Sequence, residues 1–322
     1  ERKKKKKDEA LPFPFSSSSS SLVFISSHSD LFNFRMKECD LFSSSPLRKT
    51  PTFFTVILLI LAWLANEVAL ASIHERVPRE SPPLPDLFFD FFPEIEGSIR
   101  IAEYSMLILL SNALMVIFLH RHRWHVTRRV FFCVSLSYFF RAFAISIFQP
   151  PVPSSLTYCA PKQNGGSTIV WNRVLNMFWA AGIEQLRPRE LCGDLIVSGH
   201  TLTIFISLQS FQQYAPKKLQ CLSLLYSILA YIALLAILLN RKHYSIDVVF
   251  GYLVATRVWT EYHSCVISYH DGNLSRNPLS SFLWTRVIPY LEKDVPPPHH
   301  FSNQLECPSD CLPSMGRYRE KK

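Results

Sequence analysis

Two short polar clusters interrupt an otherwise apolar sequence, and each contains a histidine. The first cluster runs from Cys192 to Thr201 and ends in Ser198-Gly199-His200, whereas the second holds His243 and Asp247. Residues four apart share one face of a helix, so Asp247 is expected to accept a hydrogen bond from one ring nitrogen of His243. That contact selects the tautomer and leaves the other nitrogen available as a nucleophile.

The first cluster has the pattern of a helix start that binds phosphate. Ser198 is a suitable N-cap residue, and Gly199 allows a ligand to approach the backbone. The free N–H groups of a helix N-terminus bind anions, and His200 would lie beside them as a general acid or base. A solvated histidine or an ordinary helix start would explain each residue alone. Two histidines and an aspartate at matching ends of two segments instead favour a catalytic site.

The composition points to a membrane protein. Hydrophobic residues make up 48% of the 322 residues and charged residues only 18%, below the roughly 25% usual in soluble domains. The apolar residues fall in blocks of about 20, which is the length that crosses a bilayer as a helix. No alternation typical of barrel strands is present, so we predict an all-α bundle of six transmembrane helices. The predicted spans are Thr52–Ile73, Ile101–Leu119, Val130–Phe148, Leu191–Phe211, Leu219–Leu239 and Tyr244–Tyr262.

Loop charges predict the orientation of these spans. Basic residues gather in regions that would lie on the same side of the membrane in a six-span chain. This side is expected to be cytosolic, and both termini would lie on it. The two polar clusters then face the lumenal or exoplasmic side. The net charge of +9 is explained by this flanking pattern, so no nucleic acid partner is expected. The basic residues that set the orientation include Arg48, Lys49, Arg121, Arg123, Arg128, Arg129, Lys217 and Lys218.

Cysteine placement adds one expectation about covalent structure. Cys159 and Cys192 are the only two cysteines on the predicted exoplasmic side, and an oxidising lumen permits a disulfide between them. Cys307 and Cys311 in the tail do not have the spacing of a zinc site. We therefore expect no metal and no cofactor.

The predicted spans divide the chain into three parts. Residues 1–51 form a low-complexity cytosolic leader, residues 52–262 the six-span catalytic domain, and residues 263–322 a cytosolic tail. Residues 1–35 combine a lysine run with a serine run, and we interpret them as a translated upstream region or a gene-model artefact. A genuine disordered tail is the alternative.

The two clusters resemble known histidine motifs. Ser198-Gly199-His200 with His243-x3-Asp247 resembles the lipid phosphate phosphatase superfamily, and the longer strings C-G-D-x3-S-G-H-T and H-Y-S-I-D-V resemble the sphingomyelin synthase family. Other matching stretches are His74–Pro78, Pro82–Asp86, Arg128-Arg129-x8-Tyr138-x2-Arg141 and Leu291–Val295, although Phe148 stands where that family is expected to have threonine. The resemblance covers roughly residues 52–296.

This resemblance implies a phosphatidylcholine:ceramide cholinephosphotransferase. His243 would attack the phosphorus of phosphatidylcholine, and Asp247 would orient His243 and stabilise its positive charge. His200 would protonate the departing diacylglycerol and then deprotonate the primary hydroxyl of ceramide, which takes phosphocholine from the phosphohistidine. This chemistry needs no metal.

Five further residues are candidates for substrate binding. Asp194, Ser198 and Gly199 belong to the first cluster, whereas Arg141 and Arg257 lie within apolar spans, where an arginine is not expected to face lipid. Asp194 could instead cap a helix, and Arg257 could extend its guanidinium to the cytosolic interface. Arg187-Pro188 resembles part of a phosphatase phosphate clamp, but Ala180 stands where the clamp lysine would be, so we interpret it as coincidental.

Other functions remain open at this level. A ceramide phosphoethanolamine synthase of the same family differs only in the donor head group, and in a lipid phosphate phosphatase water would replace ceramide. A non-enzymatic lipid-binding protein is a third class. The sequence does not distinguish residence in the Golgi from residence in the plasma membrane. It also does not distinguish a homo-oligomer from a monomer.

Overall fold

The computed structural model describes residues 48–154, 156–162, 167–178 and 191–306. Within these ranges the chain forms helices, turns and one isolated bridge, and it contains no β-strand. The all-helical prediction is confirmed. Six helices have 16 or more residues: α2 (Thr50–Ile73), α4 (Ile99–Leu119), α5 (Arg123–Ile147), α7 (Gly199–Tyr214), α8 (Leu222–Leu239) and α9 (Ser245–His270).

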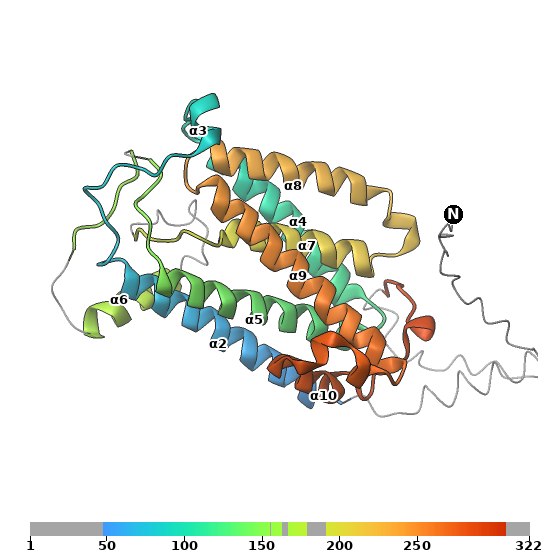
Figure 1. Cartoon of the computed structure of the whole chain (residues 1–322). Coiled ribbons are helices and arrows are strands. Elements are labelled where there is room, and N and C mark those ends of the chain that lie inside the picture. The colour runs from blue at the N-terminus through green and yellow to red at the C-terminus, as the bar shows by residue number, and fades with distance from the viewer. Residues whose placement is uncertain (1–47, 155, 163–166, 179–190, 307–322) are drawn as a thin grey trace, which may run out of the picture. The chain divides into compact units, whose positions relative to one another are not determined.

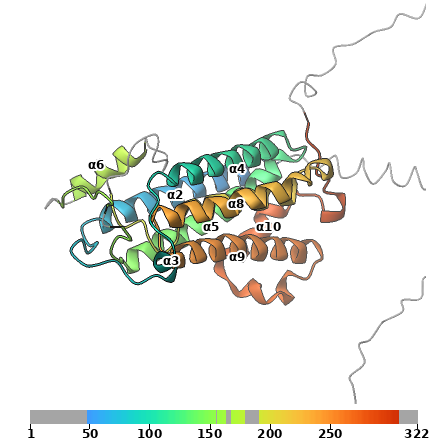
Figure 2. The ribbon, with the colours of Figure 1, turned by 90° about the horizontal axis from the view of Figure 1, so that it is seen from above.

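The long helices form a bundle in which α2 packs along α5, and α4 packs along α7 and α8 (Figure 1). Helix α9 joins these groups because it contacts both α7 and α5. The view turned by 90° shows the same long helices running side by side (Figure 2). The shorter helices α3 (Leu87–Phe91) and α6 (Ser167–Phe178) lie near one end of the bundle, and α10 (Ile288–Glu292) lies near the other.

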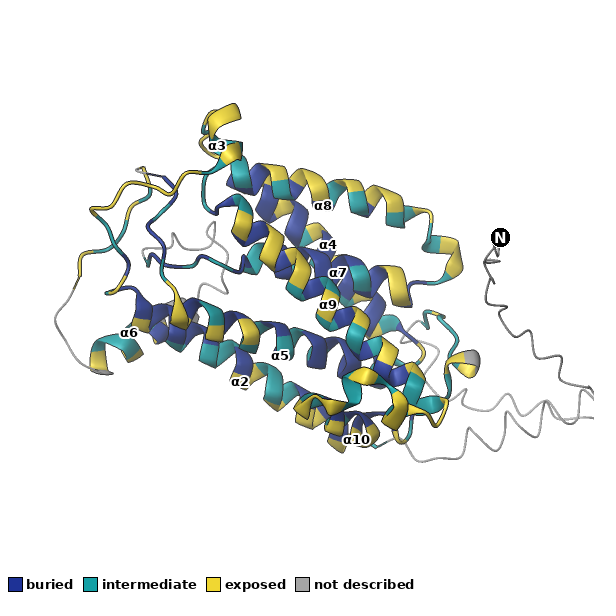
Figure 3. Cartoon of the chain, in the orientation of Figure 1, coloured by how far each residue is buried: buried dark blue, intermediate teal, exposed yellow. Residues whose placement is uncertain are grey.

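Four of the long helices, α2, α4, α5 and α8, are long and apolar enough to cross a membrane. Their outward faces carry large apolar side chains, such as Phe53 on α2, Phe143 on α5 and Leu224 on α8, which are 60%, 66% and 71% exposed. Exposed positions recur along the outer faces of the bundle in Figure 3. Extensive apolar exposure of this kind marks a surface that is covered by lipid or by another protein.

Three predicted span boundaries differ from the structure by seven or more residues, and the first is the start of α5, which lies at Arg123 and not at Val130. The span predicted from Leu191 begins as a helix only at Gly199, because Ser198 caps α7 and the preceding segment is tied to α9. In that segment Ile196 donates its backbone N–H to the Asp247 carboxylate (2.8 Å), and its own φ is +77°. At the third boundary, α9 continues to His270, eight residues beyond Tyr262, where the predicted sixth span ended.

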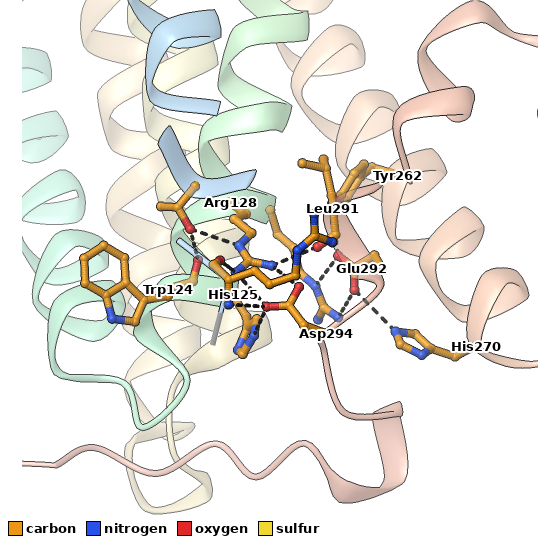
Figure 4. Close-up of polar contacts among 11 residues, drawn as sticks. Trp124, His125, Arg128, Tyr262, His270, Leu291, Glu292 and Asp294 are labelled. Atoms are coloured by element: carbon orange, nitrogen blue, oxygen red, sulfur yellow. Dashed lines mark hydrogen bonds and ion pairs between the residues drawn. The ribbon is translucent and has the colours of Figure 1, made fainter. Parts of the chain in front are cut away.

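The residues after α9 fold back onto the bundle through buried ion pairs (Figure 4). Arg129 on α5 holds the Glu292 carboxylate through two hydrogen bonds of 3.0 and 2.6 Å, and Tyr262 on α9 donates to the same carboxylate. Arg128 holds Asp294 in the same two-bond manner at 2.7 and 3.0 Å. The tail segment that contains Leu291–Val295 therefore closes one end of the bundle, and its two carboxylates neutralise two buried arginines.

These contacts shift the acidity of both tail carboxylates. Burial by itself raises the pKa of Glu292, but the Arg129 guanidinium and His270 outweigh burial and hold that pKa well below its usual range. The pKa of Asp294 is likewise lowered, because its contacts with Arg128 outweigh its burial. Carboxylates with depressed pKa values contribute stability above their unfolded pKa and lose it as the pH falls through the folded pKa.

The disulfide expected between Cys159 and Cys192 is present, with Cα atoms 5.6 Å apart. Cys192 also donates its backbone N–H to the ring of the buried His74, which follows α2 (2.9 Å). The disulfide therefore ties the segment before α7 to the loop that follows α5. The hydrogen bond to His74 ties the same segment to the end of α2.

We predict that Glu292→Gln lowers the thermal midpoint of the protein in detergent, because it leaves a buried guanidinium without its counter-charge. Breaking a buried ion pair on one side costs about 3–5 kcal/mol. Glu306→Gln is the matched control, since Glu306 pairs with Arg121 in the same part of the chain but both side chains are about half exposed. Equal midpoints for the two variants would contradict a stabilising role for the buried pair.

We predict that Cys159 and Cys192 resist alkylation by a maleimide until a reductant is added, because a disulfide has no thiol. Cys221 is exposed and free, so it should be labelled with or without the reductant, which controls for reagent access. Mass spectrometry of the labelled peptides reads each site, and labelling of Cys159 before reduction would show that the bond is absent.

Candidate active site

The two histidines of the polar clusters lie next to each other at one end of the bundle. The ring centroids of His200 and His243 are 6.2 Å apart, with an angle of 67° between the ring planes. His200 is the second residue of α7, and His243 stands two residues before α9. Two imidazoles at this separation can flank one phosphorus atom.

A close contact between α7 and α9 produces this arrangement. A Cβ atom on Gly251 of α9 would lie 2.9 Å from Cβ of Thr201 and 3.1 Å from the carbonyl oxygen of Ser198. Only glycine allows the helices to approach this closely at the point where α7 begins.

Asp247 supports His243 and also holds the surrounding backbone. Its Oδ2 lies 3.6 Å from Nδ1 of His243, which is an ion-pair distance and longer than a hydrogen bond. Its two oxygens accept backbone N–H groups from Ile196 (2.8 Å) and Tyr244 (2.9 Å). Asp247 is fully buried, so it fixes the start of α9, the segment before α7 and the environment of His243 together.

Glu103 is a neighbour of His200 that the sequence analysis missed. Its Oε1 lies 3.7 Å from Nε2 of His200, and the side chain is fully buried on α4. One signal could have identified it, because Glu103 is the only charged residue within the predicted span Ile101–Leu119, and carboxylates inside apolar spans are usually functional. Each histidine therefore has one buried carboxylate at ion-pair distance.

Ser198 caps α7 as predicted, since its side chain accepts the backbone N–H of Thr201 (3.3 Å). The structure gives a different reason for a glycine at position 199 from the one that the sequence suggested. A Cβ atom on Gly199 would lie 3.2 Å from a terminal nitrogen of Arg141. The absence of a side chain at this position therefore makes room for an arginine of the protein itself.

Arg141 and Asp194 pair with each other. Arg141 donates from Nε to the carbonyl oxygen of Val197 (2.9 Å), and its terminal nitrogens donate to Asn66 on α2 and to Asp194. Arg141 is 2% exposed. Asp194 is thus an ion-pair partner and does not cap a helix, and the guanidinium ties α2 and α5 to the segment before α7.

Arg257 is not part of this group. It lies on α9 twelve residues beyond Ser245, about 18 Å along the helix, and it is exposed. The Arg187-Pro188 pair and the tail cysteines Cys307 and Cys311 lie outside the described residues.

A cavity of about 470 Å³ extends from His200 into the bundle between α2, α4, α5 and α7. From His200 to Ser210 its wall follows ten residues of α7, about 15 Å, which is about half the thickness of a bilayer's hydrocarbon core. The far part is mainly apolar, lined by residues such as Leu110, Leu114, Ile117 and Val130. The lining also includes the polar side chains of Asn66, Glu67, Arg141 and Asp194. The cavity has the size and polarity to hold an alkyl chain with its head group at His200.

Comparisons with known proteins agree with these features. The model of the PAP2 superfamily C-terminal region matches residues 191–264, which contain both histidines. The chain is 58% identical over 254 residues to sphingomyelin synthase-related 2 of Caenorhabditis elegans, covering 79% of this chain and 78% of that protein.

Two mammalian proteins are similar over a comparable length. Phosphatidylcholine:ceramide cholinephosphotransferase 2 of Homo sapiens is 30% identical over 277 residues, covering 84% of this chain and 75% of that protein. The Mus musculus protein of the same name is 29% identical over 280 residues, covering 84% of this chain and 76% of that protein. The residues that carry the two histidine motifs thus fall within a PAP2 superfamily match, and the chain belongs to the sphingomyelin synthase family.

Proposed function

We propose that this protein transfers phosphocholine from phosphatidylcholine to the primary hydroxyl of ceramide and releases diacylglycerol. The observation that carries this proposal is the pair of imidazoles 6.2 Å apart, of which His200 lines the polar end of a cavity about one leaflet deep. The catalytic residues in this proposal are His243, His200 and Asp247.

In the first step a ring nitrogen of His243 attacks the phosphorus of the donor lipid. The N–P bond forms as the bond from phosphorus to the diacylglycerol oxygen breaks, and His200 gives its proton to that oxygen. Nδ1 of His243 faces Asp247, so Nε2 is the nucleophile. The carboxylate of Asp247 stabilises the positive charge that develops on the ring.

In the second step His200 removes the proton from the ceramide hydroxyl. The ceramide oxygen attacks phosphorus, the N–P bond to His243 breaks, and His200 is again protonated for the next turnover. Glu103 holds His200 in place and stabilises its protonated form, which is needed at the end of this step.

The remaining candidate residues act on the substrates in this proposal. The N-terminus of α7, with Ser198 and Gly199, would bind the phosphate oxygens through its backbone dipoles. Arg141 and Asp194 would border the head group at the polar end of the cavity. Arg257 is left out of this proposal, since its position on α9 is remote from the histidines.

We further propose that all six long helices cross the membrane, with both termini cytosolic and the histidines on the lumenal or exoplasmic side of the Golgi or plasma membrane. Helices α7 and α9 are not among the four that are long and apolar enough by themselves. Both are packed against other helices, and ten of the sixteen residues of α7 are buried, so protein covers much of the polar surface of α7.

Transfer of phosphoethanolamine is the second candidate. The relative that is 58% identical is named as synthase-related, whereas the relatives near 30% identity are named as cholinephosphotransferases. The two-step chemistry is the same for both head groups. A phosphatase would use the same first step, with water in place of ceramide in the second.

We predict that membranes containing the protein incorporate label from head-group-labelled phosphatidylcholine into the chain when ceramide is absent. The label should be held by an acid-labile P–N bond, map to His243 by peptide mass spectrometry, and leave as labelled sphingolipid when ceramide is added. His243→Ala should abolish the label, and Asp247→Asn should reduce the rate by about 10²–10⁴-fold, as expected for loss of support to a catalytic group.

The same experiment distinguishes the alternatives. Label from phosphatidylethanolamine alone would assign the second head group, and release of phosphocholine at the same rate without ceramide would assign a hydrolase, in which water replaces ceramide. Full activity of His243→Ala would contradict the covalent step. Membrane content of each variant, measured by immunoblot, controls for expression.

We predict that Gly251→Ala lowers turnover about tenfold while the protein remains in the membrane. The added methyl group would push α9 away from Thr201 and move His243 relative to His200, and a displacement of about 1 Å can cost 10²-fold in rate. Gly97→Ala is the control, because a Cβ atom there has nothing within 4 Å. Its positive φ of 77° costs stability without moving the site. Unchanged turnover in Gly251→Ala would contradict the role of this contact.

A further inference from the structure

Glu67 is a buried carboxylate in the wall of the cavity, and the proposed chemistry does not use it. It lies on α2 six residues before the end of the helix, and it is 5% exposed. Its one hydrogen bond comes from the amide of the adjacent Asn66 (3.2 Å), and it forms no ion pair within the described part of the chain. A buried carboxylate that lacks a cation carries a large desolvation cost.

The charges around Glu67 leave this cost uncompensated. At the polar end of the cavity Arg141 is paired with Asp194, and His200 lies at ion-pair distance from Glu103. Glu67 is connected to Arg141 only through Asn66, which donates to Glu67 and accepts from Arg141. The polar end therefore has an excess of negative charge and can bind a cation.

Aromatic side chains line the same cavity as Glu67. Trp63 lies four residues before Glu67 on α2, so the two side chains share a helix face, and both line the cavity. Tyr138 on α5 lines the same end, with the Arg141 guanidinium 5.9 Å from its ring centroid. A carboxylate beside an aromatic face is the arrangement that binds ammonium groups.

We propose that Glu67 and Trp63 form the subsite for the ammonium group of the donor head group. This inference rests on the proposed function. It adds that the protein recognises its donor lipid by the positive charge of the head group as well as by the phosphate. Asn66, Arg141 and Asp194 form a continuous polar wall beside Glu67, and this wall reaches the part of the cavity that His200 lines. The head group would lie along this wall, with phosphorus at the histidines and nitrogen at Glu67.

The test compares donors that differ in charge. Head-group transfer to fluorescent ceramide is measured in detergent micelles with phosphatidylcholine, with phosphatidylethanolamine, and with an uncharged analogue of phosphatidylcholine in which a tert-butyl group replaces the trimethylammonium group. The wild type should prefer the ammonium-bearing donors. Glu67→Gln, which keeps the shape and removes the charge, should raise KM for the preferred donor about tenfold, the loss of one charge-assisted contact. Its KM for ceramide and its rate with the uncharged donor should stay unchanged.

Three variants make the result specific. Glu67→Asp keeps the charge and should retain most of the preference. Trp63→Leu should raise KM for phosphatidylcholine more than KM for phosphatidylethanolamine. A quaternary ammonium has no N–H to donate, so its binding depends more on the aromatic face. Glu96→Gln, at an exposed position in the loop before α4, should behave as the wild type.

Two outcomes would overturn the proposals, and they are distinct. The ammonium subsite alone would be overturned if the wild type transfers a head group to ceramide but shows the same donor preference as Glu67→Gln. An equal loss of rate with charged and uncharged donors would also overturn it, because that result would indicate a structural role for Glu67. A wild type that transfers from no phospholipid would overturn the proposed function and the subsite with it.

Discussion

The contact between α7 and α9 at Gly251 is the constraint on which the site depends. It brings together the starts of two helices that are separated by more than forty residues of sequence, so that His200 and His243 face one another. Asp247 reinforces this contact, because the same carboxylate accepts backbone N–H groups from both sides and lies beside His243. The helix packing and the geometry of the candidate site are thus maintained by the same few atoms, and a change that loosens the packing also displaces the two histidines.

Buried charge is the second organising feature of the bundle. A charged group in an apolar interior must be paired and hydrogen-bonded to be tolerated. Arg128, Arg129 and Arg141 all meet this condition with carboxylates from distant parts of the chain. These pairs connect α5 to the tail at one end of the bundle and to the segment before α7 at the other. Glu67 is the exception that suggests a ligand, because a substrate cation would provide the charge that the described residues do not.

The cavity links these two features to lipid chemistry. Its polar end is bordered by His200 and by the Arg141 and Asp194 pair, and the cavity as a whole extends for about 15 Å along α7. The protein can therefore keep an alkyl chain in an apolar environment while the head group stays with the groups that react. The proposed transfer to ceramide would require this separation, because water that reached a phosphohistidine would compete with ceramide.

The sequence by itself determined the helical class, the approximate place of the six long helices and the cysteine pair, because these depend on local hydrophobicity and residue type. It also singled out His200, His243 and Asp247 as candidate site residues, since their spacing on helix starts is a local pattern. Only the tertiary structure decided that Glu103 lies beside His200, that Arg141 pairs with Asp194, and that Arg257 lies far from both. Each of these depends on which faces of separate helices meet, and helix faces are matched by packing across the whole bundle, a property that no short stretch of sequence contains.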